Sequence, residues 1–129
     1  MISWDDYFKG HDKECPKELT DDIIHNGLDT IAMGNKLLED FGEERRVNSG
    51  WRPALVNANV KGAAKGSKHL LALAIDFEDK NRKLCAFLTA NDGAKLIEHG
   101  LYMEDPIDTP IWCHVSKCPP KSGKRIYRR

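Results

Sequence analysis

The chain has 129 residues, and its 20 Lys and Arg residues balance 20 Asp and Glu residues, so the formal net charge is zero. This length fits one domain, residues 1–129, which is large enough to form a hydrophobic core without stabilising cross-links. The balanced charge gives no general attraction to nucleic acid or to an anionic membrane, and no apolar run approaches the ~20 residues of a membrane span. We therefore expect no nucleic-acid partner and no membrane insertion. The basic ending KSGKRIYRR lacks the aromatic-rich basic face that a nucleic-acid binder would add.

The cysteines and the first residues indicate a reducing compartment. The chain starts with the polar, acidic MISWDDYFKGHDKE, which contains no apolar signal-peptide core. No Cys-x-x-Cys pair occurs among the cysteines, which are Cys15, Cys85, Cys113 and Cys118. We expect free thiols rather than disulfides or a cysteine zinc site, and a chain that stays in the cytoplasm where it is made until another agent releases it.

Residues 19–42 predict a long amphipathic helix that packs on a sheet. Thr20 or Asp21 is a suitable N-cap, and Gly42 stands where a C-cap glycine belongs. Apolar side chains recur near helical spacing, at Ile24, Leu28, Ile31 and Leu38.

The rest of the chain predicts alternating strands and helices. In chain order these are a strand at 45–50, a brief helix at 53–60, a strand at 70–79, one or two helices at 82–100, and strands at 101–105, 111–117 and near 125–128. Strands that pair first across helices and then as a hairpin imply an α+β fold, with a mainly antiparallel sheet flanked by helices.

A histidine and an aspartate bracket the apolar run of the 70–79 strand. On an ideal strand, His69 and Asp76 lie on opposite faces, so they share a site only if a bulge intervenes or His69 lies in the Gly-rich loop before the strand. His114, in the 111–117 strand, is a third candidate, and two histidines with one carboxylate form a known open zinc set. Taken singly, each residue also has a plain structural role, as a loop cap, a strand end or a half-buried sheet residue.

Three ordered motifs carry a family resemblance. They are SGWRP at 49–53, SKHLLALAID at 67–76 and WCHV at 112–115. Together they resemble the zinc peptidoglycan peptidases, a family that includes D-Ala-D-Ala carboxypeptidases, D-Ala-D-Ala dipeptidases and phage L-alanyl-D-glutamate endopeptidases. The middle family pattern is S-x-H-x-x-G-x-A-x-D, and Ala72 replaces its usual glycine. The resemblance covers roughly residues 45–118, and the ending PPKSGKRIYRR is similar to short phage-encoded members.

The resemblance implies a Hedgehog/DD-peptidase-like fold and a set of residue roles. His69, Asp76 and His114 would bind a catalytic zinc ion. Arg52 would hold the scissile carbonyl or a substrate carboxylate and stabilise the charge of the tetrahedral intermediate, whereas by itself it could be a surface arginine beside a turn. Ser67 would help to position the peptide. The partner would be the peptidoglycan stem peptide, and the bond that is cut stays open among D-Ala-D-Ala, L-Ala-D-Glu and a cross-bridge.

One position departs from the family pattern. Many members carry a general-base glutamate three residues before the last histidine, but this chain has Ile111 there, which cannot transfer a proton. Other members lack this glutamate as well. Among the nearby acids Glu104, Asp105 and Asp108, we favour Glu104 as the base because it closes the strand that should pair with the strand of His114. The alternative is that Glu104 is a solvated loop acid.

Two functions follow from these residues. The leading one is a monomeric zinc peptidase of peptidoglycan, in a phage endolysin or another lytic factor that reaches the cell wall after release from the host cytoplasm. The alternative keeps the fold, with or without the metal, in a non-catalytic zinc-binding or structural phage protein, and Ile111 is the feature that favours it.

Overall fold

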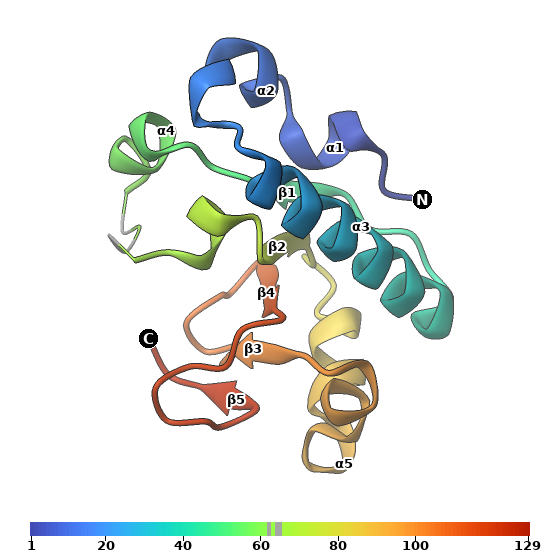
Figure 1. Cartoon of the computed structure of the whole chain (residues 1–129). Coiled ribbons are helices and arrows are strands. Elements are labelled where there is room, and N and C mark those ends of the chain that lie inside the picture. Colours follow the sequence, from blue (N-terminus) through green and yellow to red (C-terminus); the bar gives the residue numbers. More distant parts are fainter. Residues whose placement is uncertain (62, 64–65) are drawn as a thin grey trace.

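The computed structural model describes residues 1–61, 63 and 66–129. Its helices are α1 (Trp4–Phe8), α2 (His11–Glu14), α3 (Asp21–Phe41), α4 (Ala54–Ala58) and α5 (Lys83–His99), with 3-10 helices η1 (Pro16–Glu18) and η2 (Lys68–Leu71). Its strands are β1 (Val47–Ser49), β2 (Ala74–Glu78), β3 (Tyr102–Glu104), β4 (Trp112–Ser116) and β5 (Ile126–Tyr127). Figure 1 shows α1 and α3 beside the β1–β2 end of the sheet and α5 beside the other end. The α+β prediction is confirmed.

The five strands form one sheet in the order β1-β2-β4-β3-β5, with β5 parallel to β3 and the other neighbours antiparallel. Asp76 pairs with His114, and Glu104 pairs with Tyr127. The β3–β4 register, continued by one residue beyond Met103 and Val115, brings Glu104 opposite His114. Because opposed residues share a face, polar side chains of four strands lie in one row across the sheet.

The opposite face of the same strands forms the core. Ile75, Val115 and Met103 are neighbours across β2, β4 and β3, and all three are fully buried. Ile126 of β5 extends this apolar row and packs against it. Period-2 alternation therefore separates an apolar face, which stabilises the domain, from a polar face that is open to chemistry.

Helix α3 has the predicted ends, and part of its predicted apolar face is inward: Leu38 is buried and Ile31 packs against the core. The side chain of Thr20 accepts a hydrogen bond from the backbone N–H of Ile23, and Gly42 adopts the left-handed conformation at the other end. Leu28, predicted to face the sheet, is 50% exposed. Small residues also face inward: a Cβ on Gly27 would lie 2.5 Å from the ring of Phe8. The helix therefore packs by close backbone approach, which hydrophobic periodicity does not reveal.

The strand predicted at 70–79 begins later than expected. Residues 68–71 form η2, and Ala72 then adopts a left-handed conformation, with φ 58° and ψ 36°. Thr30 donates a hydrogen bond of 2.7 Å from Oγ1 to the carbonyl of Ala72 and thereby holds this turn. Alanine costs roughly 1 kcal/mol more than glycine in such a conformation, which gives a physical reason for a glycine at this point of the motif.

Helix α5 is interrupted, so the prediction of one or two helices resolves to two. Residues 90–93 have non-helical backbone angles, and three of them in succession have positive φ. No described helix is long and apolar enough to cross a membrane. The four cysteines are free thiols.

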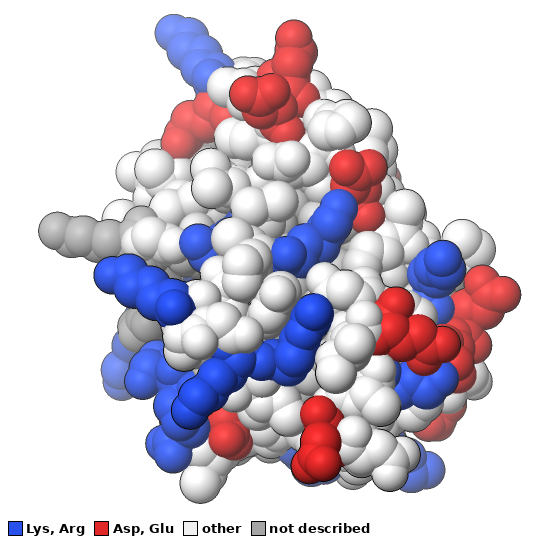
Figure 2. Space-filling model, turned by 60° about the horizontal axis from the view of Figure 1, so that its bottom comes forward, with Lys and Arg blue, Asp and Glu red and all other residues white. Residues whose placement is uncertain are grey.

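The charges are unevenly distributed over the surface. In the view of Figure 2, Lys and Arg side chains gather on the left part of the molecule, whereas most acidic side chains lie toward the top, the right and the bottom. A chain with zero formal net charge thus carries a local cationic region.

Candidate active site

His69 lies in η2, before the strand, as the loop placement predicted. Ser67 is the N-cap of this helix, and its Oγ accepts a hydrogen bond of 3.2 Å from the backbone N–H of His69. The ring Nδ1 of His69 lies 2.7 Å from the carbonyl oxygen of Gly50. A carbonyl can only accept, so Nδ1 carries the proton and the lone pair of neutral His69 is on Nε2. This buried Nε2 receives no hydrogen bond from the described residues, and it faces the carboxylate oxygen Oδ2 of Asp76 at 3.2 Å, which is also an acceptor.

The SGWRP turn holds η2 through its backbone and through Trp51. The N–H of Arg52 donates to the carbonyl of His69 (3.0 Å), and Nε1 of the buried Trp51 donates to the carbonyl of Leu70 (3.2 Å). Gly50 is required by space, because a Cβ there would lie 2.2 Å from the backbone oxygen of Tyr7. Sequence reasoning missed that Gly50 orients His69. The glycine in the SGWRP motif was the signal that could have indicated this role.

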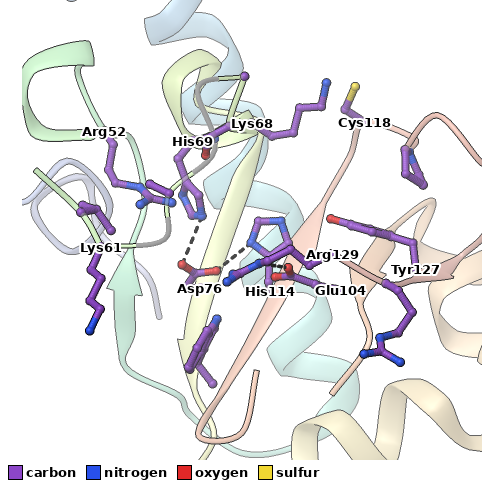
Figure 3. A pocket seen from close by; sticks show the side chains of 17 residues that line it. Arg52, Lys61, Lys68, His69, Asp76, Glu104, His114, Cys118, Tyr127 and Arg129 are labelled. Carbon is purple, nitrogen blue, oxygen red and sulfur yellow. Dashed lines mark hydrogen bonds and ion pairs between the residues drawn. The ribbon is translucent and has the colours of Figure 1, made fainter. Parts of the chain in front are cut away.

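Asp76 lies between the two histidines. Its Oδ2 is 3.2 Å from Nε2 of His69, and its Oδ1 is 2.8 Å from Nδ1 of His114 (Figure 3). Burial alone would raise the pKa of Asp76, but His69 and His114 together hold it well below its usual range. The carboxylate is therefore ionised. One ligand atom from each of the three residues lies within 4.8 Å of the others, so they can hold one metal ion.

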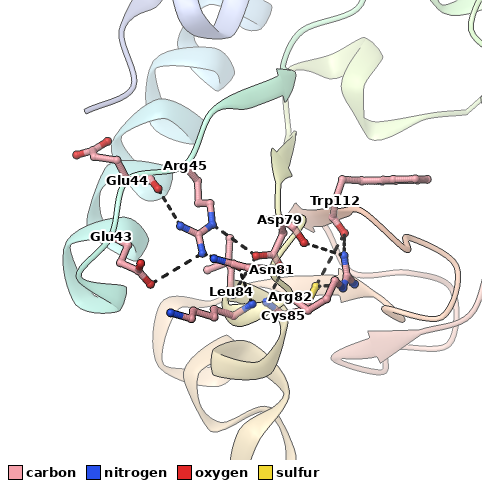
Figure 4. A network of polar contacts seen from close by, with 10 residues as sticks. Glu43, Glu44, Arg45, Asp79, Asn81, Arg82, Leu84, Cys85 and Trp112 are labelled. Atoms are coloured by element: carbon pink, nitrogen blue, oxygen red, sulfur yellow. Dashed lines mark hydrogen bonds and ion pairs between the residues drawn. The ribbon is translucent and has the colours of Figure 1, made fainter.

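A polar network fixes the strand that carries His114 (Figure 4). Asp79, just after β2, accepts hydrogen bonds from the backbone N–H groups of Leu84 (3.0 Å) and Cys85 (2.9 Å) in the first turn of α5. Arg82 donates to the carbonyl of Trp112 at the start of β4 (3.0 Å). The start of α5 thus joins β2 and β4, which supply Asp76 and His114.

We expect Asp79→Ala to lower the free energy of unfolding by about 3 kcal/mol, because it leaves two N–H groups of the helix without partners and removes a buried ionic acceptor. Arg45, whose Nε lies 3.5 Å from Asp79 Oδ1, also loses this contact but keeps its hydrogen bond to Asn81. Urea denaturation measures the change. The neighbouring Lys80→Ala is the control, since its side chain is 74% exposed and should change stability by less than about 0.5 kcal/mol. Equal effects of the two substitutions would contradict the capping role of Asp79.

A pocket of about 480 Å³ lies over the His69, Asp76 and His114 cluster. Arg52 lines it, and its Nε is buried without a hydrogen-bond partner in the described part of the chain. Burial lowers the pKa of Arg52, whereas the nearby Asp76 raises it. Arg52 therefore brings an unsatisfied cationic donor to the cluster.

Glu104 and Tyr127 line the same pocket. The side chain of Glu104 is 9% exposed, and its Oε1 accepts a hydrogen bond of 2.7 Å from Nε of Arg129. Burial raises the pKa of Tyr127 to about 12, and Glu104 and Asp76 add to this increase. Tyr127 is thus a neutral hydrogen-bond donor at physiological pH. Sequence reasoning chose Glu104 but missed Tyr127 and Arg129.

The family model of Peptidase M15 matches residues 4–115. The chain belongs to the peptidase M15 family. The match includes all three motifs and every residue of the His69, Asp76 and His114 cluster, and it assigns the chain to zinc-dependent metallopeptidases. Comparisons with curated proteins and with solved structures give no match.

The cluster of this M15 peptidase suits zinc. Two imidazole nitrogens and one carboxylate oxygen are ligand types that zinc prefers, and catalytic sites keep a further position open. The buried Nε2 of His69 has its lone pair available and no hydrogen-bond partner in the described chain. The bond from Nδ1 to Gly50 also fixes the tautomer, as outer partners of zinc-binding histidines do.

The other two acids considered for proton transfer in the M15 peptidase, Asp105 and Asp108, lie outside the pocket lining, and so does Ile111. Ile111 is 55% exposed. Asp108 is held by Arg128 Nε (3.0 Å) and by the backbone N–H of Arg129 (2.9 Å), and these bonds lower the pKa of Asp108. Among the described residues that line the pocket, the acids are Asp76 and Glu104.

A second group of possible metal ligands, Asp40, Glu98 and His99, is a poorer candidate. Lys95 Nζ already lies 2.9 Å from a carboxylate oxygen of both Asp40 and Glu98. His99 is likewise paired with Asp40, at 2.9 Å. This surface group of the M15 peptidase therefore has its charges satisfied by protein cations.

Proposed function

We propose that this zinc peptidase hydrolyses a peptide bond of the peptidoglycan stem peptide, in a phage endolysin or another lytic factor. The observation that carries the proposal is the convergence of His69, Asp76 and His114 beneath a pocket that also contains Arg52 and Glu104. The three motifs that resemble peptidoglycan peptidases contain four of these five residues, and Glu104 is the exception.

The proposed roles follow from where the side chains lie. His69, Asp76 and His114 hold the zinc ion, which when bound acts as a Lewis acid and lowers the pKa of a water toward ~7. Glu104 accepts the proton of the attacking water and delivers it to the leaving amine. Arg52 donates to the oxygen that becomes negative in the tetrahedral intermediate. Ser67 keeps η2 in place and contacts the peptide from the pocket wall.

The direct test is to incubate the zinc-loaded protein with purified peptidoglycan and to measure the release of amino groups. Mass spectrometry of the products then identifies the bond among D-Ala-D-Ala, L-Ala-D-Glu and a cross-bridge, and so separates carboxypeptidase from endopeptidase activity. Absence of new amino groups, in a protein with bound zinc, would contradict the proposal.

The second candidate function is a non-catalytic zinc-binding or structural phage protein of the same fold. The feature that favours it is Ile111, which occupies the position of the general-base glutamate of many family members and is exposed outside the pocket. This candidate predicts bound zinc without hydrolysis in the same experiment.

Arg52→Ala should lower turnover on stem peptides by roughly 10²–10³ while fold and zinc content are retained, because it removes one donor to the transition state. Arg52→Lys should restore little, since lysine lacks the planar fork of donors. Steady-state kinetics, with zinc content measured on the same samples, checks both.

The matched control is Arg46→Ala, which removes an exposed arginine from the segment before β1, outside the pocket lining. This variant should keep normal turnover. If Arg52→Ala also does, Arg52 is a surface arginine without a role in the reaction.

A further inference from the structure

The charged lining of the pocket is mainly cationic. Among the described residues that line it there are five cations, Arg52, Lys61, Lys68, Arg128 and Arg129, and two acids, Asp76 and Glu104. Glu104 is paired with Arg129, and Arg128 is paired with Asp108, which lies outside the lining. Arg52, Lys61 and Lys68 then outnumber the remaining acid, Asp76, among the described lining residues. The positive charge of the lining therefore exceeds what the acids neutralise, which favours a substrate with negative groups.

Arg52 and Arg129 approach the cluster from opposite sides (Figure 3). Arg52 follows β1, and Arg129 follows β5, so the two guanidinium groups come from opposite edges of the sheet. Both side chains are cationic and line the same pocket, so their positive charges repel each other. An anion in the pocket would relieve this repulsion.

Arg129 is held in a defined position with donors to spare. Its Nε binds Glu104 Oε1, and its backbone N–H binds Asp108 Oδ2 at 2.9 Å. Its two terminal nitrogens make no hydrogen bond within the described part of the chain. The side chain is 56% exposed, so these donors are accessible from the pocket. A guanidinium that is fixed at Nε and has free terminal N–H groups is preorganised to bind a carboxylate.

We propose that Arg129 binds a carboxylate of the substrate on the side of the His69, Asp76 and His114 cluster opposite Arg52. The preferred substrate is then a stem peptide with a free carboxylate beside the scissile bond, rather than one in which this group is amidated. This inference rests on the proposed function, whose substrate class it narrows.

The test uses two stem peptides that differ in one group beside the scissile bond, a carboxylate in one and the neutral amide in the other. Binding is measured by calorimetry on the metal-free full chain, so that turnover does not interfere, and KM and kcat are measured on the zinc-loaded protein. We expect the wild type to bind the carboxylate peptide about tenfold more tightly, the size of one partly exposed charged contact. Arg129→Gln should abolish this preference by weakening only the carboxylate peptide.

Two further variants make the result specific. Lys124→Gln removes an exposed cation outside the pocket lining and should keep the tenfold preference. Arg129→Lys keeps the positive charge but loses the planar pair of guanidinium donors, so it should keep part of the preference for the carboxylate peptide.

Each remaining outcome has a defined meaning. Equal affinity of the wild type for the two peptides would overturn the inference. A second result would also overturn it: Arg129→Gln lowers kcat equally for both peptides but keeps the preference for the carboxylate peptide. Arg129 would then act only on Glu104. A preference that depends on Arg129 in a zinc-loaded protein without hydrolysis would support the carboxylate site and contradict the proposed function.

Discussion

His69→Ala or His114→Ala should remove the metal from a protein that otherwise carries about one zinc ion per chain. Each substitution deletes one of three ligands. Loss of an outer partner of a zinc ligand already costs roughly 10–100-fold in affinity, so loss of a ligand should cost more. Elemental analysis after dialysis measures zinc content, and hydrolysis of peptidoglycan should disappear with the metal.

His25→Ala is the matched control, since this histidine is exposed on α3 and its ion-pair partner among the described residues is Asp29. It should leave zinc content and hydrolysis unchanged. If His69→Ala and His114→Ala both retain full zinc, the proposed ligand set is wrong, and a metal held elsewhere would then need to be located.

Glu104→Gln should keep zinc and stability but lower hydrolysis by roughly 10²–10⁴, the usual contribution of a general acid–base group. The amide is close to isosteric, and its oxygen can still accept the hydrogen bond from Arg129 that Glu104 accepts now. A loss of rate therefore reports proton transfer rather than a displaced Arg129. The rate of amino-group release per zinc-loaded chain measures the effect.

Asp108→Asn is the comparison, because Asp108 is bound to Arg128 and lies outside the pocket lining. It should reduce hydrolysis much less. A larger effect of Asp108→Asn would mean that the β3–β4 loop moves over the metal and that the two acids exchange roles. If neither change matters in an active protein, the reaction proceeds without a nearby carboxylate base.

Local sequence signals predicted much of the fold. Thr20 and Gly42 end α3 because capping depends on the residues within one turn, and the alternation around Asp76 and His114 gave the strands of the sheet. Leu28 was misplaced because its exposure depends on Phe8, which fills the space beside Gly27. The late start of β2 depends in the same way on Thr30, whose hydroxyl holds the carbonyl of Ala72.

In the candidate site, too, the residues in local motifs could be predicted, whereas a residue placed by long-range packing could not. His69, Asp76, His114 and Arg52 could be predicted because they belong to motifs whose spacing is preserved in the sequence. Arg129 could not, because its place depends on the parallel pairing of β5 with β3 across the sheet. A terminal basic run gives no local sign that one of its arginines lies against Glu104.

Tyr7 links the site to the first helix of the chain. Its backbone lies against Gly50, the residue whose carbonyl orients His69, and its hydroxyl donates to the carbonyl of Ala74 at 3.1 Å, two residues before Asp76. A single aromatic residue from α1 therefore acts as a template for the backbone beside two members of the cluster. Grafting the three motifs onto another sheet would transfer the side chains without this template, and the histidine would lose its fixed orientation. A designed copy of the site has to include α1 as part of the catalytic unit.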